Sequence, residues 1–160
     1  MTGPEMMALM RPNAGTPRDA SVDEWAKVLA AFPLFSDVNG RRLRKLVRQA
    51  RFAEFAAGDR VISDGERANS LYVILGGAAK VVQKPAARTL GVGDYFGELA
   101  LIDGTTRSAT VVATQELHVM ALPWQSVERA ARQDATIAFT MLRQLSTQVR
   151  RLEAQGAGSV

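Results

Sequence analysis

The chain has 160 residues, enough for one domain, and its hydrophobic fraction of 47% suits a packed core and excludes a disordered chain. It contains no cysteine and a single histidine, His118, which excludes disulfides, iron–sulfur clusters, thiolate or multi-histidine metal sites and a cysteine nucleophile. The net charge of +4 originates in residues 41–51, which hold six of the twenty basic residues and no acidic one.

The N-terminal part predicts a tail followed by a helix. Residues 1–20 show no usable periodicity and are predicted to form a mobile tail. Ser21, with Glu24 three residues later, predicts a capping box that begins a helix. This helix is expected to end near Ala31, because Pro33 cannot continue it.

The basic segment 41–51 predicts a second helix, capped by Asp37 or Asn39. Its apolar residues recur at a spacing of 3.6 and form one stripe, consisting of Leu43, Leu46, Val47 and Ala50. The basic side chains are expected to form a solvated face opposite this stripe. The alternative is a surface that binds a partner or the phosphates of DNA.

Between Arg51 and Leu122, short runs rich in β-branched and aromatic residues are separated by Gly, Asp and Asn, which predicts a series of short strands. The expected strands are Phe52–Phe55, Arg60–Ser63, Ser70–Leu75, Ala78–Gln83, Thr89–Leu90, Ser108–Ala113 and Glu116–Leu122. Gly76-Gly77 predicts a two-residue hairpin between the third and fourth strands. The pattern indicates a sandwich, barrel or jelly roll in which His118 is an ordinary sheet residue.

Two helices are predicted after the strands. The first begins at Pro123 and ends near Arg132, and the second begins after Asp134 as its N-cap and ends near Ala154. Residues 155–160 are predicted to form a C-terminal tail. The second helix has an apolar seam that consists of Met141 or Leu142, Leu145, Val149 and Leu152. This seam is expected to pack in the core, and the alternative is a homodimer contact.

Residues 91–111 contain more glycine and polar residues than core packing requires. The glycines follow G-x-G-x-x-x-G, which misses the dinucleotide-binding fingerprint by one residue, and no Walker lysine is present. Gly97 permits close approach of a ligand, and residues 98–101 predict one helical turn whose N–H groups can face an anion. Arg107 and Ser108 supply further donors.

Glu98 would repel an anion, so its carboxylate is expected to accept a hydrogen bond from a ribose hydroxyl of the same ligand. A single arginine suits a singly charged phosphodiester better than a triphosphate. The segment therefore predicts a site for a cyclic nucleotide.

These residues resemble the phosphate-binding cassette of the cyclic nucleotide-binding domain family. The matching positions are Gly93-Asp94, Phe96 to Leu101 and, after five residues, Arg107-Ser108-Ala109. Pro33-Leu34-Phe35, Ala57-Gly58-Asp59 and residues 71–77 are similar to earlier segments of the family. The resemblance implies one domain over residues 21–154, mainly β with flanking α: an eight-stranded antiparallel jelly roll with N-terminal helices and two C-terminal helices.

The resemblance also implies the roles of individual residues. Arg107 would bind the cyclic phosphate and Glu98 the ribose 2′-hydroxyl. The backbone from Gly97 to Ala100, including Leu99, and the Ser108 hydroxyl would complete the phosphate site. The candidates for contact with the base are Val82 and Leu90. Arg150 and Arg151 are expected to lie on a solvated helix face, with a cap over the base as the alternative. No metal or further cofactor is implied.

The function expected from these observations is a non-catalytic cytoplasmic sensor that signals to an unidentified effector by movement of its C-terminal helices. No membrane span or secretory leader is evident in the sequence. Cyclic AMP is favoured over cyclic GMP, because the sequence shows no clear guanine-reading side chain. One alternative is a fragment of a transcription regulator similar to the catabolite activator, although no helix-turn-helix is found. A second is a protein that contacts DNA through residues 41–51, and a third is the regulatory domain of a larger channel or enzyme.

Overall fold

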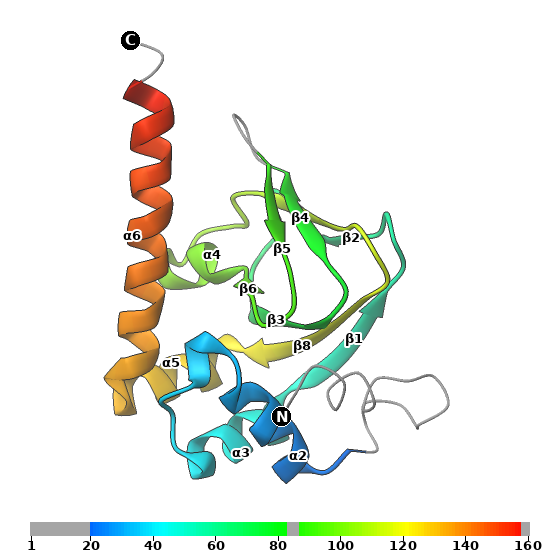
Figure 1. Cartoon of the computed structure of the whole chain (residues 1–160), viewed down its shortest axis with the longest axis vertical. Helices are drawn as coiled ribbons and strands as arrows, with labels where there is room; N and C mark the ends of the chain where they lie inside the picture. Colours follow the sequence, from blue (N-terminus) through cyan, green and yellow to red (C-terminus); the bar gives the residue numbers. More distant parts are fainter. Residues whose placement is uncertain (1–19, 83–86, 158–160) are drawn as a thin grey trace.

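The computed structural model describes residues 20–82 and 87–157, so residues 1–19 of the predicted N-terminal tail lie outside it. Within these ranges, eight strands form two four-stranded antiparallel sheets, in the orders β1-β8-β3-β6 and β2-β7-β4-β5 (Figure 1). This arrangement confirms the predicted β roll with flanking helices. The strands are β1 (Arg51–Phe55), β2 (Arg60–Ile62), β3 (Ser70–Gly76), β4 (Ala79–Val82), β5 (Arg88–Leu90), β6 (Tyr95–Phe96), β7 (Thr110–Ala113) and β8 (Leu117–Pro123).

The helix α2 (Val22–Ala30) begins with the predicted capping box. The Ser21 hydroxyl accepts a hydrogen bond from the Glu24 N–H at 3.1 Å, and the Glu24 carboxylate accepts one from the Ser21 N–H at 3.0 Å. The short helix η2 (Pro33–Phe35) follows, with proline in its first turn. Sequence thus located the start and end of α2 to within a residue.

The basic helix α3 (Gly40–Gln49) is capped by Asn39, whose side-chain oxygen accepts a hydrogen bond from the Arg42 N–H at 2.9 Å. This observation decides between the two predicted caps. The helix ends two residues earlier than predicted, because Arg51 opens β1 and its backbone pairs with β8.

The sheet β1-β8-β3-β6 is buried on both faces. One face packs against the helices in a core that includes Trp25, Phe35, Leu43, Leu71, Val73, Met120 and Leu122. The other face lies inside the roll against the second sheet, in a core that includes Ile62, Ile74, Val81, Phe96, Leu117 and Val119. The uninterrupted apolar runs of β3 and β8 are therefore explained by burial on both sides.

The hairpin predicted at Gly76-Gly77 is wrong, because β3 and β4 belong to different sheets. The chain crosses from one sheet to the other at this point. Gly77 has φ +85°, and a Cβ atom there would overlap the carbonyl oxygen of Glu116. The glycine thus serves a close backbone approach and not a two-residue turn. The strand β6 was also not predicted, since its two residues are too few for a pattern.

The C-terminal helices are α5 (Trp124–Gln133) and α6 (Ala135–Ala157). Pro123 ends β8 and precedes α5, so it does not occupy the predicted first turn of that helix. Helix α6 continues to Ala157 and includes half of the segment predicted as a tail. No helix in the described ranges is long and apolar enough to cross a membrane.

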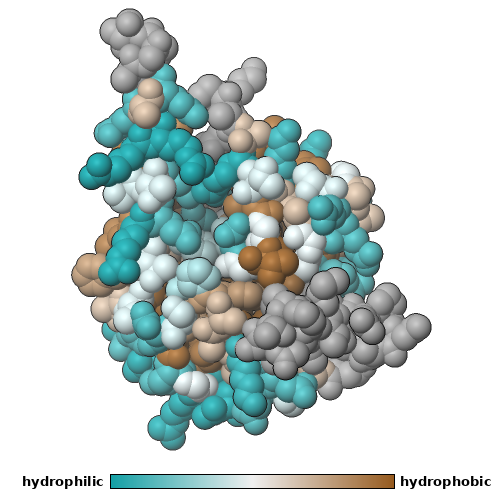
Figure 2. Space-filling model, viewed as in Figure 1, coloured by the Kyte–Doolittle hydropathy of each residue, from teal (hydrophilic) through white to brown (hydrophobic). Residues whose placement is uncertain are grey.

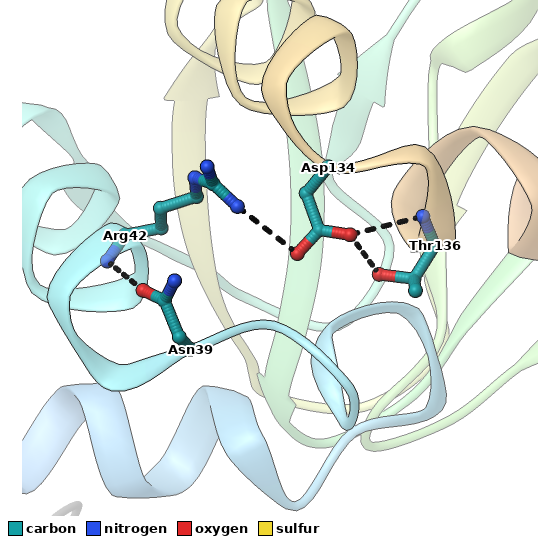
Figure 3. Close-up of polar contacts among 4 residues, drawn as sticks. All are labelled: Asn39, Arg42, Asp134 and Thr136. Atoms are coloured by element: carbon teal, nitrogen blue, oxygen red, sulfur yellow. Dashed lines mark hydrogen bonds and ion pairs between the residues drawn. The ribbon is translucent and has the colours of Figure 1, made fainter.

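Asp134 lies at the junction of α5 and α6 and caps α6, as predicted. Its carboxylate accepts a hydrogen bond from the Thr136 N–H at 3.0 Å and another from the Thr136 hydroxyl at 2.6 Å (Figure 3). The other carboxylate oxygen lies 3.4 Å from a guanidinium nitrogen of Arg42. These contacts hold the pKa of Asp134 below its usual value and join α3 to the start of α6.

The predicted core packing of the seam on α6 is confirmed for Met141 and wrong for Leu142, Val149 and Leu152. Ile137 and Met141, near the start of the helix, are buried, but Leu142, Val149 and Leu152 are 59%, 52% and 54% exposed. The reason is geometric: α6 stands beside the roll with this face turned outward, and apolar surface is visible along its outer flank (Figures 1 and 2). The homodimer contact through this helix stays a prediction.

Candidate functional site

The turn between β6 and helix α4 (Glu98–Asp103) forms one wall of a cavity at the open side of the roll. All six residues predicted for the phosphate and ribose line this cavity: Gly97, Glu98, Leu99, Ala100, Arg107 and Ser108. The rest of its lining comes from the strands and from α6, and consists of Ile62, Val81, Arg88, Phe96, Ala109, Val111 and Gln148. The structure thus brings the two halves of the cassette together around one space.

Gly97 immediately precedes α4 and has a left-handed conformation, with φ +91°. A Cβ atom at this position would lie 2.5 Å from a guanidinium nitrogen of Arg107, closer than such atoms approach. Glycine is therefore required both by the backbone conformation and by the neighbouring arginine.

Arg107 is almost completely buried, with 4% of its surface exposed. Its guanidinium donates hydrogen bonds to the backbone carbonyl of Gly97 at 2.6 Å and to that of Ser70 at 2.9 Å. Its Cζ atom lies 5.7 Å from the ring centroid of Tyr72, which in turn stacks on Phe96. These contacts fix the guanidinium, and its remaining N–H donors are available to an anion in the cavity.

Glu98 is the first residue of α4 and is 5% exposed. Burial raises the pKa of its carboxyl above the ordinary value, while the positive charges of Arg88 and Arg107 oppose this shift. A buried carboxylate beside a fixed guanidinium gives the cavity one strong hydrogen-bond acceptor next to a strong donor group. A ligand that fits both must carry an anionic group and a hydroxyl donor close together.

Only some of the residues predicted to contact the base line a cavity. Val82 is exposed on the outer face of β4, and the strand alternation instead turns its neighbour Val81 into the cavity. The prediction for Val82 is thus off by one residue, which in a strand means the opposite face. Leu90 and Arg151 line a second cavity, while Arg150 lines neither of the two.

This second cavity, of about 250 Å³, lies between α6 and β5. Its lining consists of Arg88, Thr89, Leu90, Asp94, Tyr95, Gln144, Thr147, Gln148 and Arg151. Arg88 and Gln148 line both cavities and therefore stand where the two meet. Neither was predicted from the sequence, because each reaches the site only through the packing of β5 and α6 around the cassette.

His118 lies outside both cavities, as expected for a sheet residue. It pairs in register with Glu54 of β1, and its ring nitrogens lie 3.5 Å from the carboxylates of Glu54 and Glu116. Its surroundings belong to the sheet and not to the candidate site.

Comparison with known proteins gives a family for this arrangement. Residues 52–134, just over half of the chain, match the family model of the cyclic nucleotide-binding domain. A cyclic nucleotide-gated potassium channel of Rhizobium etli is 35% identical over 105 residues, which make up 66% of this chain and 29% of the channel. A cAMP-dependent protein kinase regulatory subunit of Schizosaccharomyces pombe is 38% identical over 95 residues, or 58% of this chain and 23% of that protein.

The chain spans less than a third of these relatives. Among solved structures, a protein kinase A regulatory domain described as bound to Sp-2Cl-cAMPS aligns with a TM-score of 0.73. The alignment covers 86% of this chain and 95% of that one at 22% sequence identity, which demonstrates a common fold. Together, the matched family model and the shared fold show that the chain belongs to the cyclic nucleotide-binding domain family.

Proposed function

We propose that this chain binds a 3′,5′-cyclic nucleotide, with Arg107 on the cyclic phosphate and Glu98 on the ribose 2′-hydroxyl. The observation that carries the proposal is the presence of a fixed guanidinium and a buried carboxylate on one cavity. In a cyclic nucleotide the singly charged phosphodiester is fused to the ribose, so an anion and a hydroxyl donor lie side by side. This matches the donor and acceptor of the cavity.

The surroundings of Arg107 favour a phosphodiester over more highly charged ligands. Glu98 lies in the same cavity and would repel the additional charge of a monophosphate or triphosphate. The backbone N–H groups that open α4 and the Ser108 hydroxyl add neutral donors, which suit a single negative charge.

The proposed role is that of a non-catalytic regulatory domain. The matched relatives are named as a gated channel and a kinase regulatory subunit, and the match covers only a minor part of each. We therefore propose that the bound nucleotide acts on an effector through α6, which contributes Gln148 to the cavity. Contact of α3 with DNA stays a separate prediction, carried only by its exposed cationic face.

Calorimetric titration of the full chain with cyclic AMP and cyclic GMP tests the proposal directly. At least one of them should bind with one-to-one stoichiometry, and the corresponding 5′-monophosphate should bind much more weakly because it carries an additional charge. A protein that is folded, by circular dichroism, but binds neither cyclic nucleotide would overturn the proposal.

Glu98→Gln is expected to weaken binding of the cyclic nucleotide about 5- to 150-fold, because a neutral amide oxygen is a poorer acceptor than a carboxylate, a difference of about 1–3 kcal/mol. The 2′-deoxy cyclic nucleotide lacks the donor and should bind the wild type weakly, with little difference between the wild type and the variant. Titrations of both ligands against both proteins check this expectation. Equal affinity of the wild type for the ribo and deoxy ligands would show that Glu98 has another role.

The raised pKa of Glu98 predicts a dependence on pH in opposite directions for stability and binding. Burial makes the ionised carboxylate unfavourable in the ligand-free fold, so the folded protein is more stable while Glu98 is protonated. This stability is lost as the pH rises through the raised pKa. Ligand affinity should instead fall as pH is lowered through that pKa, because the acceptor becomes protonated. Glu98→Gln should therefore raise the Tm of the ligand-free protein at neutral pH, by about 2–8 °C for each kcal/mol gained in the free energy of unfolding. The same variant should remove the pH dependence of binding.

Bound nucleotide is expected to slow amide exchange in α6 beyond Met141. This part of the helix extends past the core and faces the cavities with Gln144, Gln148 and Arg151. Contacts to the ligand would remove conformations in which it moves away from the roll. Hydrogen exchange with and without nucleotide measures this, with the buried strand β3 as the unchanged control. Protection confined to residues 97–108 would contradict a signalling role for α6.

A further inference from the structure

A groove between helices α3 and α5 takes no part in the proposed nucleotide site. Its floor is apolar and buried, and is formed by Leu46 of α3 and Ala130 of α5. Its walls are polar, with Arg42, Lys45 and Gln49 from α3 and Ser126, Arg129 and Gln133 from α5. The lining of this α3–α5 groove therefore has three cationic side chains and no acidic one.

Two of these three cations have no partner in the described part of the chain. Arg42 is paired, because one of its guanidinium nitrogens lies 3.4 Å from the carboxylate of Asp134 (Figure 3). Lys45 and Arg129 are exposed, and neither makes a side-chain ion pair or hydrogen bond within residues 20–82 and 87–157. Two positive charges thus flank an apolar floor, and the groove itself supplies no negative charge to neutralise them.

The groove is too small for a free nucleotide or a metabolite of similar size. Its volume of about 20 Å³ gives room for one or two water-sized groups. The carboxylate of a glutamate or aspartate side chain is of this size, and its methylene groups can pack on the apolar floor. The amides of Gln49 and Gln133 can form hydrogen bonds with the backbone of a peptide that carries such a side chain.

We propose that the α3–α5 groove docks an acidic segment of a partner protein, with a carboxylate of that segment between Lys45 and Arg129. Charge complementarity identifies the occupant, since the groove offers cationic donors and no acidic group. Hydrogen bonds between charged groups are about twice as strong as those between neutral ones. Complementary charges also accelerate association and exclude partners of like charge. This inference goes beyond the proposed nucleotide site and does not depend on it.

The packing of α3 favours a protein partner over DNA. A helix that reads a duplex enters the major groove, which is about 12 Å wide, so it must project from the protein. Helix α3 instead packs against both α2 and α5. Two of its cations are already paired with neighbouring segments, since Arg44 lies 3.8 Å from Asp23 of α2 and Arg42 contacts Asp134 after α5. A carboxylate side chain needs only the groove.

The test measures binding of a fluorescein-labelled peptide of Glu-Leu-Ala-Glu-Ala repeats to the full chain by fluorescence anisotropy. The wild type should bind this peptide, more weakly as salt is added, and should not bind the same peptide with Gln in place of Glu. Lys45→Glu and Arg129→Glu should each weaken binding about 2- to 30-fold, because each replaces an exposed attraction by a repulsion of similar size. Arg143→Glu, the same change of charge at an exposed position of α6, should keep the wild-type affinity.

Three results would overturn the inference. The first is a folded wild type that does not bind the acidic peptide, and the second is an equal loss in Arg143→Glu, which would show an effect of net charge alone. The third is tighter binding of a DNA duplex or of phosphatidylserine vesicles that Lys45→Glu and Arg129→Glu abolish, which would assign these cations to phosphates. Lys45→Gln and Arg129→Gln remove the charge without reversing it and replace any reversed variant that circular dichroism shows to be unfolded. None of these results bears on nucleotide binding, which the titrations above test separately.

Discussion

Arg107→Ala is expected to weaken cyclic nucleotide binding about 30- to several-thousand-fold. Removing one member of a buried, hydrogen-bonded charge pair costs about 2–5 kcal/mol, and each 1.4 kcal/mol corresponds to about tenfold in affinity. The guanidinium is fixed by the carbonyls of Gly97 and Ser70 before any ligand arrives, so little ordering of this side chain opposes binding. Calorimetric titration of the wild type and the variant measures the loss.

The same two hydrogen bonds mean that Arg107→Ala also affects the fold. The carbonyls of Gly97 and Ser70 lose their partners, so the variant should have a lower Tm even without ligand. Arg107→Lys keeps the charge and serves as a second variant, and Arg60→Ala controls for the loss of an exposed arginine. Affinity within threefold of the wild type, in a variant with an unchanged circular dichroism spectrum, would contradict the assignment of the phosphate site.

Gly97→Ala should weaken binding more than tenfold, although it leaves every proposed ligand-binding side chain in place. A non-glycine residue at φ +91° is strained by about 1–3 kcal/mol. The added methyl group would also displace the Arg107 guanidinium, which lies within 2.5 Å of the new Cβ atom. Binding should therefore suffer through the position of Arg107, in addition to the loss of stability.

Gly58→Ala is the matched control for the strain. Gly58 has the same φ of +91°, but no atom lies within 4 Å of a Cβ placed there. Both variants should have a lower Tm, and only Gly97→Ala should lose affinity in titrations at a temperature where both are folded. Equal affinity in the two variants would show that the close approach of Gly97 to Arg107 has no role in the site.

The cassette was predictable because its signals are local in sequence. Gly97, Glu98 and Arg107 lie within eleven residues, and their chemistry indicates an anion and a hydroxyl before any fold is known. The helix caps at Ser21 and Asn39 are local in the same sense, since each side chain bonds to a backbone group three residues later.

The features that the sequence did not reveal depend on contacts between distant segments. Arg88 and Gln148 are sixty residues apart and meet at the cavity only through the packing of β5 and α6. The face on which Val81 and Val82 lie depends on strand register, and a shift of one residue exchanges them. The periodicity of the seam on α6 correctly predicts one face of a helix, but periodicity cannot show whether that face is turned toward the core.

The contact between Arg42 and Asp134 has a thermodynamic consequence. Any rearrangement of α6 about its first residue either breaks this pair or carries α3 with it. If nucleotide binding changes that junction, it is coupled energetically to any binding event at the N-terminal helices. Such coupling is reciprocal. A partner protein that binds the N-terminal helices would then change the affinity for the nucleotide by a certain factor. The nucleotide would change the affinity for that partner protein by the same factor.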